Sequence, residues 1–180
     1  MKDFVIGIQT RIGLNDQNVR AAVTTFADVA IRNIECSDYG DIFRFNHRVA
    51  MLDQLGGRTN TRDGLEKGQL SLESCGYNNN ARRIIILITD GMANKGIGKE
   101  KGLFKASLEI KAKGTIIQAV TVGDDLYNVL ERTMIPPTNI YSLNYLNLDE
   151  VVNNVCGNND SRKGINSKNK SSYDFLNSNI

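Results

Sequence analysis

The feature that most constrains the fold is a pair of short, mainly apolar segments, residues 84–88 and 116–123, of which the first is uninterrupted. Apolar runs of this length, without polar alternation, are typical of strands that are covered on both faces in a parallel sheet. Between them, residues 102–113 predict an amphipathic helix with apolar positions at Leu103, Phe104, Ala106, Leu108 and Ile110. The order strand, helix, strand predicts an α/β fold with right-handed crossovers.

The remaining segments fit the same alternation of strands and helices. Residues 19–26 and 29–34 predict a hairpin across Ala27-Asp28. Residues 140–143 predict a last strand. Further helices are expected at 2–12 (Phe4, Val5, Ile8 and Ile12 on one face), 38–55 (capped by Ser37 or Asp38 and stopped by Gly56-Gly57), 62–74 (apolar at Leu65, Leu70 and Leu72), 125–134 and 148–156. We predict one domain over residues 1–156 and a polar, disordered tail over 157–180, where Asn, Ser and Lys dominate.

The charge balance excludes several classes of partner. The chain of 180 residues has 22 Lys and Arg against 20 Asp and Glu, a net charge of +2. This balance gives no general attraction to nucleic acids or anionic membranes. The longest apolar run is too short to span a bilayer, and no apolar leader follows Met1. We therefore expect neither nucleic-acid binding nor membrane insertion.

The cysteines and the single histidine give no sign of a metal centre or a catalytic group. Cys36, Cys75 and Cys156 lack C-x-x-C spacing, and their odd number leaves at least one thiol without an internal partner. Their pairing stays open, and we favour small, partly buried hydrophobic residues over a redox role. His47 is the only histidine, and we expect it on a helix surface.

Two short motifs place oxygen ligands at one edge of the expected sheet. Gly56-Gly57-Arg58-Thr59-Asn60-Thr61 precedes a helix, and Ile88-Thr89-Asp90-Gly91 ends a buried strand. Loops at the carboxyl ends of parallel strands converge on one crevice. The Thr61 hydroxyl and the Asp90 carboxylate could meet there, and both are hard oxygen ligands of the kind that Mg²⁺, Mn²⁺ and Ca²⁺ prefer. Taken singly, Thr61 has a simpler interpretation as part of a helix cap and Asp90 as a turn residue.

The segments GGRTNT, IIILITDG, IIQAVTVG and IYSLNYLNLDEVVNNVC, in this order, resemble the von Willebrand factor A domain family over residues 1–156. The resemblance implies a Rossmann-like, mostly parallel sheet with one antiparallel edge hairpin and helices on both faces. It also implies an extracellular adhesion or matrix module, similar to those of matrilins, type VI collagen and integrins. In the family's metal ion–dependent adhesion site, Thr61 and Asp90 match metal-binding positions, with Arg58, Asn60 and Gly91 at the rim. An acidic side chain of a matrix partner completes the family's site.

The chain departs from the family pattern at its amino-terminal end. No D-x-S-x-S sequence occurs, and the first residues match the family's first helix, so the central first strand and its serine loop are missing. We expect unpaired backbone groups on the two neighbouring strands. We also expect an incomplete site at Thr61 and Asp90, with weak or no binding of Mg²⁺, Mn²⁺ or Ca²⁺ by this chain alone. In extracellular members of the family, a cysteine at the end of the last helix, here Cys156, often pairs with a cysteine before the first strand. That upstream cysteine is not in this chain. A metal-independent interaction module and a fragment of a larger protein therefore remain as alternatives.

Residues 96–102 offer a rival of another class, a nucleotide-binding α/β enzyme. Their spacing, G-x-G-x-x-x-G, loosely resembles a dinucleotide fingerprint. A phosphate cradle needs its first glycine in the turn that follows the strand, whereas Gly96 comes about six residues after the strand end. The chain has neither a P-loop lysine motif nor a nucleophile elbow. We predict a binding module rather than an enzyme.

Overall fold

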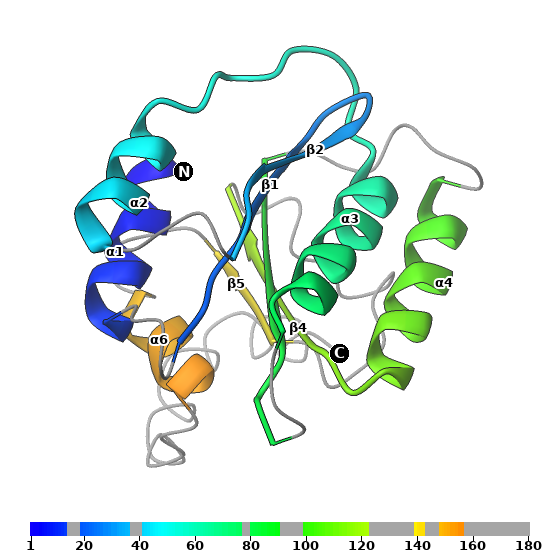
Figure 1. Ribbon diagram of the computed structural model, residues 1–180. Coiled ribbons are helices and arrows are strands. Elements are labelled where there is room, and N and C mark those ends of the chain that lie inside the picture. Colours follow the sequence, from blue (N-terminus) through cyan, green and yellow to red (C-terminus); the bar gives the residue numbers. More distant parts are fainter. Residues whose placement is uncertain are drawn as a thin grey trace, which may run out of the picture.

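The computed structural model describes residues 1–13, 19–36, 41–76, 80–90, 99–122, 139–142 and 148–156. Its helices and strands lie close to the predicted order. They are α1 (Lys2–Ile12), β1 (Val23–Phe26), β2 (Ala30–Ile34), α2 (Ile42–Ala50), α3 (Thr61–Ser74), β3 (Ile84–Thr89), α4 (Lys99–Ala112), β4 (Ile116–Thr121), β5 (Asn139–Ser142) and α6 (Leu148–Cys156). Figure 1 shows helices on both sides of the strands, which confirms the predicted α/β class.

The strands form two separate sheets in the described part of the chain. β3, β4 and β5 make a parallel sheet in that order, and β1 pairs antiparallel with β2 alone. The register of β3 and β4 runs from Ile84 opposite Ile116 to Thr89 opposite Thr121. The two apolar runs of the sequence are therefore direct neighbours, as a parallel crossover requires. The predicted hairpin is also confirmed, although Phe26 faces Ala30 and its loop includes Val29.

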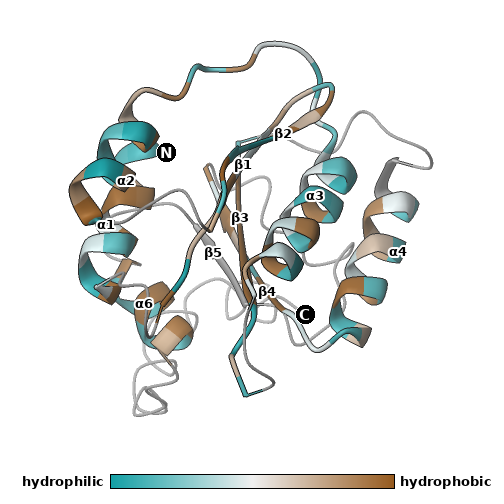
Figure 2. Ribbon diagram, viewed as in Figure 1, coloured by the Kyte–Doolittle hydropathy of each residue, from teal (hydrophilic) through white to brown (hydrophobic). Residues whose placement is uncertain are grey.

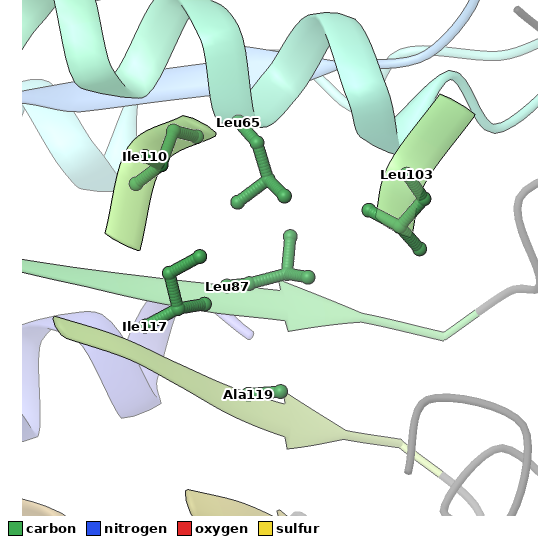
Figure 3. Close-up of a cluster of buried hydrophobic side chains, with 6 residues drawn as sticks. All are labelled: Leu65, Leu87, Leu103, Ile110, Ile117 and Ala119. Carbon is green, nitrogen blue, oxygen red and sulfur yellow. The ribbon is translucent and has the colours of Figure 1, made fainter. Parts of the chain in front are cut away.

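One core layer lies between the parallel sheet and the helices α3 and α4. Leu87 on β3 and both Ile117 and Ala119 on β4 point toward these helices, because alternate residues of a strand share a face. Figure 3 shows them facing the side chains that the helices contribute. The cluster consists of Leu65, Leu87, Leu103, Ile110, Ile117 and Ala119.

The opposite face of the sheet packs against α1 and α6. Val120 on β4 lies among Phe4 and Ile8 of α1 and the apolar residues Leu148, Val151 and Val152 of α6. A third cluster, Ile34, Phe45 and Val49, joins α2 to the hairpin. Figure 2 shows β3 and β4 as a predominantly hydrophobic centre, with hydrophilic segments on the surrounding helices and on the hairpin.

The predicted helix over residues 38–55 is wrong at both ends. α2 begins after Asp41, whose Oδ1 accepts a hydrogen bond of 2.7 Å from the Arg44 amide, so neither Ser37 nor Asp38 is its cap. It ends at Ala50 rather than at Gly56-Gly57. The buried stripe of Phe45 and Val49 would continue at position 53, where an exposed aspartate cannot pack into the core.

The prediction that certain apolar helix residues face the core is also wrong. Leu70, Phe104 and Leu108 are 42–45% exposed. On α3 the buried face instead contains small and polar residues: Thr61, Gly64, Gln69 and Ser71. A Cβ atom at Gly64 would lie 2.8 Å from Cγ of Phe26, so the helix approaches β1 too closely for a larger side chain. The predicted helix over 125–134 and the tail over 157–180 lie outside the described residues.

A disulfide joins Cys36, just after β2, to Cys75, at the end of α3, with a Cα–Cα distance of 5.1 Å. The interpretation of these two cysteines as small hydrophobic residues is therefore wrong. Cys156 is an exposed free thiol, the unpaired cysteine that the odd count requires. His47 lies exposed on α2, as predicted.

Candidate functional site

The direction of α3 determines where the two predicted metal-binding residues lie. Near its carboxyl end, Gln69 accepts a hydrogen bond of 2.9 Å from the hydroxyl of Thr115, the residue before β4. One turn later, Glu73 lies 2.8 Å from the Lys113 ammonium group. The end of α3 is thus fixed beside the amino ends of the parallel strands, and the helix runs antiparallel to them (Figure 1).

The start of α3 is consequently level with the carboxyl end of β3. A Cβ atom at Gly68 would contact Ile85, which fixes one point where helix and strand lie side by side. Back from Gly68 to Thr61 the helix covers about 10 Å. From Ile85 to Asp90 the strand covers about 16 Å in the same direction. Thr61 and Asp90 therefore share the carboxyl edge of the sheet, the edge at which open α/β sheets bind ligands.

Asn60, predicted at the rim of the site, forms the amino-terminal cap of α3. Its side-chain oxygen accepts from the Asp63 amide at 3.3 Å, and its amide group donates to the Asp28 carbonyl at 3.3 Å. Its backbone N–H donates to the Ala27 carbonyl at 2.8 Å. Asp63 in turn accepts from the Ala30 amide at 2.6 Å. Four hydrogen bonds thus hold the start of α3 in place, and three of them join it to the β1–β2 hairpin.

The predicted site residues differ in their exposure to solvent. Thr61 is only 1% exposed, whereas Asp90 and Arg58 are exposed. Gly91 lies outside the described residues. Of the predicted site residues that the structure describes, Asp90 presents a carboxylate and Arg58 a guanidinium group to solvent, whereas Thr61 is buried. This pattern of charges suits a polar contact with another protein.

Thr61 and Asp90, the described donors at this edge, do not by themselves make a dedicated metal site. Mg²⁺ requires near-octahedral oxygen coordination, whereas the two predicted ligands among the described residues are one buried hydroxyl and one exposed carboxylate. Across the described residues, no group of three or more His, Cys, Asp or Glu side chains could hold a metal ion. A cation at this edge would take most of its ligands from water or from a partner.

Sequence reasoning missed the contact between Gly57 and the hairpin. Gly57 has φ 109°, and a Cβ atom there would lie 2.3 Å from Oδ2 of Asp28. Only glycine fits such a position without strain. The Gly56-Gly57 pair is a detectable signal in the sequence, but its interpretation as a helix stop is wrong, because α2 ends at Ala50. Its actual role is to let the segment before α3 pass directly against the hairpin loop.

The shifted pKa values result from ion pairs, hydrogen bonds and burial, and only Arg62, next to Thr61, lies near this edge. Hydrogen bonds from Lys113 and Gln69 lower the pKa of Glu73, near the amino ends of the strands. Burial lowers the pKa of Lys111. The pKa of Arg62 is raised by its hydrogen bond to Glu66, one turn along α3. These shifts have structural causes and do not mark a catalytic acid or base.

A sequence model of the von Willebrand factor type A domain matches residues 1–154. The chain belongs to this family. Von Willebrand factor type A domains are generally interaction modules rather than enzymes. The family assignment and the observed fold confirm the resemblance inferred from the four sequence segments. No curated protein matches the sequence.

Solved structures with the von Willebrand factor type A fold are similar over most of this chain. Proximal thread matrix protein 1 from the mussel byssus has 25% sequence identity and a TM-score of 0.66, over 86% of this chain and 39% of that one. A second structure of the mussel protein, at 23% identity to this chain, has a zinc-occupied MIDAS motif, the metal ion–dependent adhesion site. Manganese-loaded TRAP protein of Plasmodium vivax has 16% identity and a TM-score of 0.65, over 84% of this chain and 61% of that one. This chain thus spans less than two thirds of the length of each of these proteins.

In the described part of the chain, none of the helices is both long and apolar enough to cross a membrane.

Proposed function

We propose that this chain is a protein-binding module of the adhesion or matrix type, and that it contacts its partner with the carboxyl edge of the sheet. The observation that carries the proposal is the common position of Thr61, at the start of α3, and Asp90, directly after β3. Arg58 and Asn60 lie in the segment that leads into α3 and extend the contact surface. Because the hairpin holds this first turn, the surface is preorganised, which lowers the entropic cost of binding.

A divalent cation contributes weakly to this binding. Zinc occupies the MIDAS motif in one similar structure, and a second similar structure is manganese-loaded. Among the described residues the predicted oxygen donors are Thr61 and Asp90, so an Mg²⁺, Mn²⁺ or Ca²⁺ ion bound by these two would depend on an acidic side chain of the partner for further coordination. The donor set favours the metal-independent form of the interaction. Most of the binding free energy then comes from direct protein contacts.

Two features favour an extracellular location. The Cys36–Cys75 disulfide is of a kind that persists in oxidising compartments. The similar mussel protein is, by its name, a matrix protein of the byssus. We accordingly propose a secreted matrix partner with acidic side chains, rather than a cytoplasmic one.

The test is a solid-phase binding assay with immobilised fibrillar collagen and laminin as probes of matrix proteins. We expect Asp90→Asn to weaken binding about tenfold or more, the size of one lost charge-assisted contact. Glu109→Gln provides the matched control, because its carboxylate is exposed on the outer side of α4, near the helix end that precedes β4. Circular dichroism would establish that both variants fold.

The same assay with EDTA separates the two forms of the proposal. Binding that survives EDTA but decreases in Asp90→Asn indicates the metal-independent module. Binding that EDTA abolishes indicates a cation completed by the partner. Equal loss in Asp90→Asn and Glu109→Gln, or no loss in either, would contradict a binding surface at this edge.

A further inference from the structure

Three helices end at the amino edge of the parallel sheet, which is the edge where its strands begin. Figure 1 shows α3 and α4 side by side and running in the same direction, so both end at this edge. α6 ends here too, because its Val155 carbonyl accepts a hydrogen bond of 3.1 Å from Arg82, two residues before β3. The last carbonyl groups of a helix lack partners within the helix and carry partial negative charge, so they attract cations.

Arginine side chains bind each of these helix ends. Besides Arg82 at α6, Arg83 donates to the Lys113 carbonyl just after α4. Arg20 donates to the Gly76 carbonyl just after α3, at 3.0 Å. A guanidinium group has five N–H donors, more than these capping bonds use, and it stays charged when it caps a helix. The caps therefore hold positive charge at fixed positions along the amino edge.

Positive charge is in clear excess at this edge. The described helix ends and the residues that lead into β3 (73–76, 80–83, 111–115 and 153–156) contain one acidic residue, Glu73. The cations of the edge are Arg20, Arg82, Arg83, Lys111 and Lys113. The Glu73 carboxylate lies 2.8 Å from the Lys113 ammonium group and compensates that charge. Positive charges thus exceed negative ones by four in these segments.

The sequence after α6 has the same sign of charge. Residues 157–180 follow directly on Cys156, which lies at the amino edge, and contain four Lys or Arg and two Asp. The net charge of +2 for the whole chain is therefore accounted for by this segment, and residues 1–156 are neutral overall. The excess at the amino edge is consequently balanced by negative charge elsewhere in the domain. A balanced total thus conceals a positive pole, and local fields of this kind attract polyanions.

We propose that the amino edge of the sheet binds a sulfated polysaccharide of the extracellular matrix. Guanidinium groups bind the oxygens of sulfate, as they bind those of phosphate and carboxylate, through paired N–H donors. A linear chain with repeated sulfate groups suits cations that are spread over three helix ends, because successive sulfates can contact successive cations. The preference for a polysaccharide over a nucleic acid rests on the extracellular location proposed above, which the Cys36–Cys75 disulfide favours.

This surface is separate from the proposed protein-binding edge. β3 runs from Ile84 to Thr89 between Arg83 and Asp90, so these two residues are about 20 Å apart along the strand. A polysaccharide at the amino edge would leave the carboxyl edge accessible. One domain could then hold a matrix polysaccharide at one end and a protein at the other.

The test measures binding of a fluorescent heparin oligosaccharide to the full chain by anisotropy, at several salt concentrations. Arg82→Gln with Lys113→Gln removes two cations whose side chains are exposed. We expect this variant to bind about tenfold or more weakly at about 0.15 M salt, with a shallower dependence on salt, because fewer counterions are released. Arg44→Gln with Lys105→Gln is the matched control, since it removes the same charge from exposed positions on α2 and in the middle of α4. Its affinity should stay within about twofold of the wild type.

A second pair of variants separates charge from helix capping and from the protein-binding edge. Arg82→Lys with Lys113→Arg keeps both charges and should bind heparin nearly as well as the wild type. Asp90→Asn should also leave heparin binding unchanged, so this proposal and the protein-binding proposal can fail independently. Circular dichroism would establish that every variant folds.

Four results would overturn the proposal. The first is absence of heparin binding at about 0.15 M salt. The second is an equal loss in Arg82→Gln with Lys113→Gln and in the matched control, because binding would then follow total charge. The third is a comparable loss in the variant that keeps both charges. The fourth is equally tight binding of a DNA duplex or of chemically desulfated heparin, because sulfate groups would then not be what the edge recognises.

Discussion

Reduction of the Cys36–Cys75 disulfide should cost a large share of the stability of this domain. The two cysteines are 39 residues apart, and the loop they close contains α2, the segment that leads into α3, and α3 itself. In the chain-entropy treatment, closing a loop of this length removes unfolded-state entropy equivalent to about 4 kcal/mol at 25 °C. The total free energy of unfolding of a domain of this size is typically about 5–15 kcal/mol. Loss of the disulfide would therefore leave the folded domain only marginally stable.

Urea unfolding, followed by circular dichroism with and without a phosphine reductant, measures this loss. The double variant Cys36→Ala with Cys75→Ala should reproduce the reduced protein, apart from a small cost for the two missing sulfur atoms in a buried site. Cys156→Ala is the matched control, because its thiol is exposed and free. A loss below about 1 kcal/mol on reduction would refute the reasoning, because it would mean that the unfolded chain gains little freedom.

The remaining predictions concern packing, backbone conformation and charge. Leu65→Ala should lower the free energy of unfolding by about 2–5 kcal/mol, because the side chain is fully buried, whereas exposed Leu70→Ala on the same helix should change it by less than about 0.5 kcal/mol in urea unfolding. Gly57→Ala should cost about 1–2 kcal/mol from its positive φ, besides the collision with an aspartate carboxylate, while Gly56→Ala, with open space around it, should cost far less in thermal unfolding. The folded-state pKa of Glu73 is lowered, so its ion pair stabilises the fold above the unfolded-state pKa and loses this effect as the pH falls through the folded value. Glu73→Gln should thus be less stable than the wild type at pH 7, with a deficit that shrinks as the pH falls through the folded-state pKa, and a deficit independent of pH would contradict the assignment.

Those parts of the fold that depend on apolar periodicity were predictable from the sequence. The two apolar runs became β3 and β4, and the helices at 2–12, 62–74 and 148–156 differ from the prediction by at most one residue at an end. Local patterns were enough there because each element buries one continuous stripe or face. α2 was mispredicted because its helical pattern continues through Leu52 and Leu55, although the core contact ends at Val49. Periodicity alone cannot show where a neighbouring element ends.

The candidate site was only partly predictable, because its geometry depends on long-range contacts. The order of the motifs placed Thr61 and Asp90 at one sheet edge, and the direction of α3 agrees with that placement. The role of Asn60 as a cap bound to the hairpin, and the close approach of Gly57 to Asp28, involve residues about 30 positions apart. The disulfide was equally hidden, since three cysteines allow more than one pairing and spacing does not select among them.

The contacts of α3 imply that stability and partner binding are separable in this domain. The helix is attached at its start by hydrogen bonds from Asn60 and Asp63 to the hairpin, and at its end by the Cys36–Cys75 disulfide. Reduction of the disulfide weakens the attachment at the end that is distant from Asp90, whereas the capping bonds at the binding edge persist while the domain is folded. Partner affinity below the unfolding temperature should therefore stay nearly constant on reduction, even though the unfolding temperature falls. A parallel decrease of affinity in the reduced protein at a temperature where circular dichroism shows a full fold would mean that the disulfide also positions the binding edge.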